Sequence, residues 1–332
     1  MLLRGALVVV GLSVLAASAL AQPPTERPAA NAQRAAAVKA KGTQLTGDHI
    51  IVWFTPALTR QEVESIVRRL DPTIGEAKRV IGKHDWQRIG NQKITYYFVD
   101  ESFIANSSSE GEVFIPAEFI KQEGRAPFLG LAIQELLTPK RPFPLGETND
   151  PDVRLADFVF SIWHGVGDYI ATAVKDRTAF VETGSVDLGK PAAVDALCAQ
   201  RLGGVDSAKV VPYMGAAGRP RELFGPERTK YAPPFNTCAM SFAKFLIERS
   251  SLQSVIGLMN KLPDGVKAVQ AEIQRITGQA VTTVRDEWQR KIGLKSASSS
   301  PAVDIPVRRT PDGRPDLQGT WHYDGNPPAE IS

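Results

Sequence analysis

The sequence predicts an α+β domain, with a small sheet in the first half of the chain and helices in the second half. Three short runs between residues 48 and 116 are rich in β-branched and aromatic side chains, which is typical of strands. After residue 237 apolar side chains recur every three or four positions, which indicates helices. Strands followed by helices favour a segregated α+β architecture.

The predicted strands span residues 49–54, 93–99 and 112–115. Thr59 and Glu62 follow the first strand with the spacing of a capping box, so a helix is expected from there to about Val80. Two more helices are expected at residues 128–138 and 158–171, separated by a segment with four prolines in residues 138–151 that borders a possible cleft. The closing helices are expected at residues 237–248, 252–260, 266–277 and 281–292.

The two ends of the chain differ in composition from its middle. Residues 1–21 combine Arg4, an apolar run and small residues at Ala19 and Ala21, as in a cleavable signal peptide. Residues 22–47 are expected to form a flexible lead-in because they hold few large apolar side chains. The domain then covers residues 48–294, and residues 295–332 form a Ser/Pro-rich linker and short tail. The protein is therefore expected to be secreted or periplasmic.

The order of these pieces over residues 48–293 resembles the gluzincin, peptidase MA-like family of zinc metallopeptidases. The resemblance rests on residues 113–116, on the helix with Gln134, Glu135 and Thr138, and on residues 163–169. Shorter matches in the closing helices lie at residues 241–248, 276–278 and 287–288. The resemblance implies a zincin-like fold, in which a small mixed sheet and two active-site helices precede a helical half.

Position by position, the resemblance places a degenerate metal site in this chain. Gln134 and Thr138 stand where the family has the two His ligands of H-E-x-x-H, and Glu135 stands at the general base. His164 stands where the family has its third ligand, a Glu. Asp168 stands where the family has a further carboxylate, one turn after that ligand. A neutral amide, a hydroxyl and one His are a poor ligand set for catalytic zinc. No cofactor is therefore expected.

The resemblance and the lost ligands together imply an exported non-catalytic relative, a pseudopeptidase, which holds a peptide or protein partner in the relic cleft. An extended partner would add to the sheet edge, for which residues 112–115 are the candidate. Glu135 and His164 are expected to meet where zinc would lie. Two alternatives stay open, namely an active hydrolase with a non-standard site that recruits zinc, and a structural protein of the cell envelope.

Other features of the sequence bear on its partners, on the pairing of its cysteines and on a competing catalytic motif. The net charge of +3 gives no reason to expect nucleic acid as a partner, and no membrane span is expected after the signal peptide is removed. Cys198 and Cys238 are expected to form a disulfide in an exported protein, although two buried thiols remain the alternative. Ser241 and Lys244 match S-x-x-K of serine acyl-enzymes but lack the other motifs of that class. The oligomeric state stays open.

Overall fold

The computed structural model describes residues 27–103, 105–108, 110–121, 128–141, 160–178, 180, 188–215, 223 and 226–294. The predicted signal peptide and the predicted C-terminal tail lie outside these residues, as does most of the proline-rich segment 138–151. The chain divides into two units after Leu294. The first unit has an α+β fold.

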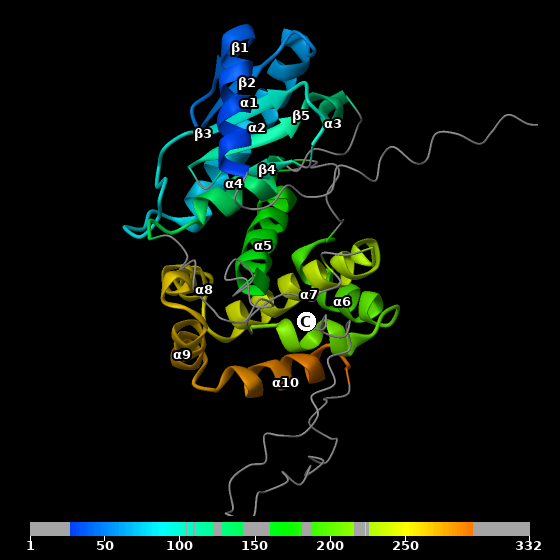
Figure 1. The fold of residues 1–332 in the computed structure, drawn as a ribbon. Helices are drawn as coiled ribbons and strands as arrows, with labels where there is room; N and C mark the ends of the chain where they lie inside the picture. Colours follow the sequence, from blue (N-terminus) through cyan, green and yellow to red (C-terminus); the bar gives the residue numbers. More distant parts are fainter. Residues whose placement is uncertain are drawn as a thin grey trace, which may run out of the picture. The chain divides into compact units, whose positions relative to one another are not determined.

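Five strands form one mixed sheet in the order β1-β2-β3-β5-β4, drawn in Figure 1. Their bounds are β1 Thr43–Thr46, β2 Ile50–Phe54, β3 Ile94–Val99, β4 Asn106–Ser107 and β5 Glu112–Pro116. The strands β2, β3 and β5 are parallel, whereas β1 and β4 run antiparallel to their neighbours at the two edges. The expected edge strand at residues 112–115 is therefore interior, because β4 pairs with it at Phe114 and Val113.

The expected flexible lead-in is also wrong, because residues 27–46 form helix α1 (Arg27–Lys41) and strand β1. Alanine-rich sequence favours a helix even where large apolar residues are few. Val38 of α1 is buried in a small cluster with Tyr97 and Phe114 on one face of the sheet. The Arg34 side chain is 5% exposed and ion-pairs with Glu101 at 2.7 Å, so a buried cation anchors this helix.

Helix α2 (Arg60–Ile81) connects β2 to β3 and packs on the other face of the sheet. It begins with the expected capping box between Thr59 and Glu62. In its middle, the Asp71 carboxylate accepts hydrogen bonds from three successive backbone N–H groups of the β1–β2 turn, at Asp48 (3.1 Å), His49 (2.8 Å) and Ile50 (3.0 Å). A Cβ on Gly47 would lie 2.3 Å from this carboxylate, so a larger residue there would have to displace it.

The remaining helices are α3 Ala117–Lys121, α4 Phe128–Leu136, α5 Phe160–Thr178, α6 Val194–Leu202, α7 Arg228–Arg249, α8 Leu252–Gly257, α9 Val266–Thr277 and α10 Val281–Lys291. Helix α5 contacts α2 and α4 beside the sheet, and crosses α7 in the helical half. At the crossing, a Cβ on Gly165 would lie 2.1 Å from the Ala239 carbonyl oxygen. This glycine therefore allows the two backbones to touch.

None of the helices in the described part of the chain is both long enough and apolar enough to cross a bilayer.

Candidate functional site

Helix α4 carries the predicted site and lies against α2, α5, β4 and β5. It ends at Leu136, two residues earlier than the sequence predicts. The Thr138 hydroxyl turns back and donates to the Gln134 carbonyl at 2.8 Å, and the Thr138 N–H donates to the Glu135 carbonyl at 3.1 Å. Thr138 therefore closes the end of helix α4.

Glu135 is 1% exposed, and its Oε2 accepts a hydrogen bond from the backbone N–H of Gly111 at 2.7 Å. Gly111 immediately precedes β5 and has a φ of 78°, which glycine adopts at little cost. A buried carboxylate needs hydrogen-bond donors to offset the loss of water. The residue at the general-base position therefore joins α4 to the start of β5.

The end of α4 is also held by the segment that follows α2. The Gln87 side chain donates to the Leu136 carbonyl at 3.0 Å. The backbone N–H of Arg88 donates to the Thr138 carbonyl at 2.9 Å. The last carbonyl groups of a helix lack partners within it. The two bonds provide such partners from a segment almost 50 residues earlier in the chain. The sequence gives no signal for this contact, since Gln87 belongs to no recognisable motif.

Helix α5 brings the second set of predicted residues to α4. A Cβ on Gly167 would lie 3.9 Å from both Gln134 Cγ and Ile133 Cγ2, so the two helices that the sequence singles out do pack together. His164 and Asp168 are both partly exposed on α5, and the His164 ring meets the Trp163 ring edge-to-face with centroids 5.3 Å apart. The pairing of Glu135 with His164 stays a prediction.

The polar groups around α4 do not suit a catalytic zinc ion. Zinc in such a site takes three protein ligands from His, Cys, Asp or Glu, whereas Gln134 offers an amide and the Thr138 hydroxyl is bound to a carbonyl of its own helix. Among the described residues, no group of three or more His, Cys, Asp or Glu side chains is placed to hold a metal ion. No step of zinc chemistry follows from this arrangement.

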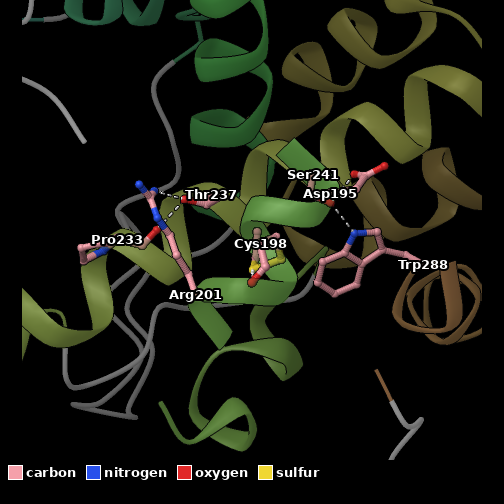
Figure 2. Close-up of a disulfide and its surroundings, with 8 residues drawn as sticks. Asp195, Cys198, Arg201, Pro233, Thr237, Ser241 and Trp288 are labelled. Carbon is pink, nitrogen blue, oxygen red and sulfur yellow. Dashed lines mark hydrogen bonds between the residues drawn. A yellow bond between two sulfur atoms is a disulfide. The ribbon is translucent and has the colours of Figure 1, made fainter. Parts of the chain in front are cut away.

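The predicted disulfide is confirmed. Cys198 of α6 and Cys238 of α7 are joined with an S–S distance of 2.05 Å and a Cα–Cα distance of 4.9 Å. Figure 2 shows this bond between the two helices, with Arg201 pointing to the Thr237 hydroxyl beside it. The same hydroxyl donates to the Pro233 carbonyl at 2.8 Å. Helix α6 is thus fixed to α7 by one covalent bond and by side-chain contacts one turn away.

A polar cluster lies on the other side of the disulfide, around Ser241. Its hydroxyl donates to Asp195 Oδ1 at 2.7 Å and accepts from Trp288 Nε1 at 2.9 Å, as drawn in Figure 2. Lys244 ion-pairs with the second oxygen of Asp195 at 2.7 Å and with Glu248 at 2.8 Å. Ser241 is completely buried. The S-x-x-K residues therefore join α6, α7 and α10 rather than forming a nucleophile.

The electrostatics of this cluster favour its charged state. Burial would raise the pKa of Asp195, but hydrogen bonds from Lys244 and Ser241 outweigh burial and leave the pKa below its usual value. Burial would likewise lower the pKa of Lys244, but hydrogen bonds to Asp195 and Glu248 leave that pKa raised. Asp195 lies 46 residues from Ser241, so the sequence alone could not identify it as a partner.

Comparison of the chain with protein-family models and with curated proteins finds no match. The gluzincin resemblance therefore rests on the residues quoted above.

Proposed function

We propose that this chain is an exported, non-catalytic relative of the gluzincin zinc metallopeptidases, which binds an extended peptide or a protein partner beside α4. The observation that supports the loss of catalysis is the role of Glu135. A general base must reach the water that it activates, whereas this side chain is 1% exposed and binds the Gly111 N–H. The side chain at the expected base position serves as a structural link.

The place for a partner is the sheet edge at β4. This strand pairs with β5 on one side and contacts α4, so a peptide added along β4 would lie beside the helix with the relic site. Strand addition needs backbone groups and not a metal ion. Peptide binding can therefore persist after the ligands are lost. The disulfide between Cys198 and Cys238 is in keeping with export, because such bonds persist in oxidising compartments.

One experiment tests both parts of the proposal. The mature chain is purified, its zinc content is measured, and fluorescein-labelled β-casein serves as an unstructured probe for binding and for cleavage, with and without added zinc. We expect substoichiometric zinc, no cleavage, and weak saturable binding by fluorescence anisotropy. A Ser107→Pro variant should bind the probe less well, since proline cannot extend a ladder of strands.

Three outcomes would contradict the proposal. Stoichiometric zinc with cleavage that Glu135→Gln abolishes would show an active enzyme. Binding without cleavage that Ser107→Pro leaves unchanged would place the peptide elsewhere. A complete lack of binding would favour the structural envelope protein. An exposed position away from this edge, tested as Asp85→Asn, provides the matched control and should leave binding unchanged.

A further inference from the structure

Strand β1 forms the other edge of the sheet, and its residues alternate between bonding to β2 and pointing away from it. It pairs with β2 in the register Thr43↔Phe54 to Thr46↔Ile51, and the N–H of Gly47 donates to the Ile50 carbonyl at 2.9 Å. Hydrogen-bonded pairs alternate along an antiparallel ladder. Counting back from Gly47 in steps of two, Leu45 and Thr43 are the residues of β1 whose backbone groups bond to β2. The backbone groups of Gln44 and Thr46 consequently point away from β2.

Within the described part of the chain, no strand pairs with this outer side of β1. Proteins protect such edges with very short strands, charged residues, proline, bulges or a covering helix or loop. The four residues Thr-Gln-Leu-Thr of β1 contain neither a charge nor a proline, and their register against β2 is continuous. Three of the four side chains are exposed. The edge is therefore competent to accept another strand.

We propose that β1 pairs with β1 of a second copy of this chain, so that two sheets become continuous across a two-fold axis. An antiparallel register that places Leu45 opposite Leu45 puts Gln44 of each copy opposite Thr46 of the other. Both outward N–H groups and both outward carbonyl groups of each copy then find partners. A closed two-fold dimer uses the same patch on both copies, and β1 meets this condition without any shift of register.

The charges at the two ends of β1 favour a second copy over other partners. Lys41, the last residue of α1, lies before the strand, and Asp48 lies in the turn after it; both are exposed. Antiparallel pairing brings opposite ends of the strand together. Each Lys41 therefore approaches Asp48 of the other copy, and symmetry produces this attraction twice. A parallel neighbour would instead place like charges side by side.

The dimer is expected to be weak. A pair of four-residue strands covers little surface, below the roughly 1,200 Å² of a stable protein interface. Analytical ultracentrifugation of the mature chain should therefore show a monomer–dimer mixture within about 1 µM to 1 mM. Gln44→Pro removes an outward N–H that β2 does not use, and should weaken the dimer at least tenfold. The control Gln44→Ala keeps that N–H and should leave the affinity within about threefold of the parent.

Charge exchange provides the decisive test. A dimer of the Lys41→Glu variant alone would place like charges at positions 41 and 48 of the two copies, and so would a dimer of the Asp48→Lys variant alone. Each variant by itself should therefore dimerise less than the parent. A mixture of the two variants places opposite charges at both contacts and should restore dimers. Circular dichroism and thermal melting verify that each variant is folded.

The inference would be overturned by a chain that stays monomeric at 1 mM, by a dimer that tolerates Gln44→Pro, or by mixed variants that do not recover. Binding of β-casein that is lost in Gln44→Pro without any self-association would show that β1 accepts an extended peptide instead. These outcomes are independent of the proposed peptide site at β4, which Ser107→Pro tests at the opposite edge.

Discussion

The junction of α4 with β5 and the junction of α6, α7 and α10 both contain residues that resemble catalytic motifs, but the two are held together differently. In the first, side chains bind backbone groups, as Glu135 does at Gly111 and Thr138 does at Gln134. In the second, side chains bind other side chains across three helices, and a disulfide adds a covalent link. Motif-like residues can thus serve purely as structural links.

This difference has a consequence for stability. Contacts to the backbone hold one loop or strand start in place. A disulfide and an ion-paired cluster respond to reductant and to pH. We therefore expect the helical half to respond to its chemical environment, and the α4 junction to respond mainly to substitution.

The largest expected effect is the loss of the disulfide. Cys198 and Cys238 are 40 residues apart, and closing a loop of that length stabilises a domain by roughly 4 kcal/mol in the chain-entropy model. Urea unfolding should show that the Cys198→Ala, Cys238→Ala double variant has lost about that free energy of unfolding. Reductant should destabilise the parent and have no effect on the double variant. Equal stability of oxidised and reduced parent chains would mean that the helices need no covalent link.

A smaller effect is expected at α4. Glu135→Ala leaves the buried N–H of Gly111 without its acceptor and should lower the free energy of unfolding by about 2 to 3 kcal/mol. Glu135→Gln keeps an acceptor oxygen of similar size and should cost about 1 kcal/mol or less. The difference between the two variants, measured by urea unfolding, reports the lost hydrogen bond together with the cavity that alanine leaves. If the two variants were equally stable, this carboxylate would not join α4 to β5.

An effect smaller than that of Glu135→Ala is expected from Asp195→Asn, and it should depend on pH. The folded pKa of Asp195 lies below its usual value because hydrogen bonds from Lys244 and Ser241 outweigh the effect of burial. A depressed carboxyl pKa stabilises the fold above the unfolded pKa of about 4, and this stabilisation is lost as pH falls through the folded pKa. The variant should therefore be less stable by about 1 to 2 kcal/mol at pH 7.

That difference should shrink steadily as the pH is lowered below about 4. Thermal or urea unfolding of parent and variant across this range measures it. Asp85→Asn serves as the control, because Asp85 is exposed and lies outside this cluster. A difference that did not vary with pH would show that the asparagine disturbs packing instead of removing a charge.

Much of the fold could be predicted because local sequence determined it. Thr59 and Glu62 lie three residues apart and form their capping box within the first turn of α2. The run Ile50–Phe54 alternates between buried and half-buried positions as a strand should. The disulfide could be predicted because the sequence contains only two cysteines and its first residues favour export.

The parts that the sequence could not predict depend on contacts distant along the chain. Helix α1 is anchored by Arg34, whose partner Glu101 lies 67 residues later, and composition alone suggested a flexible segment. Strand β4 has two residues and exists only because β5 is beside it. The carbonyl group of Leu136, at the end of helix α4, accepts a hydrogen bond from Gln87, 49 residues earlier. None of these pairings leaves a periodic pattern.

Asp71 also bears on the order in which the molecule folds. Its contacts to Asp48, His49 and Ile50 span only 21 to 23 residues, so forming them closes a short loop at low entropic cost. The β1–β2 turn can therefore settle on α2 before the helices beyond residue 160 have been made. Such an early unit would shelter the apolar residues of β2 while the rest of the chain folds. Pulse-labelling hydrogen exchange should find the amides of His49 and Ile50 protected before those of α7.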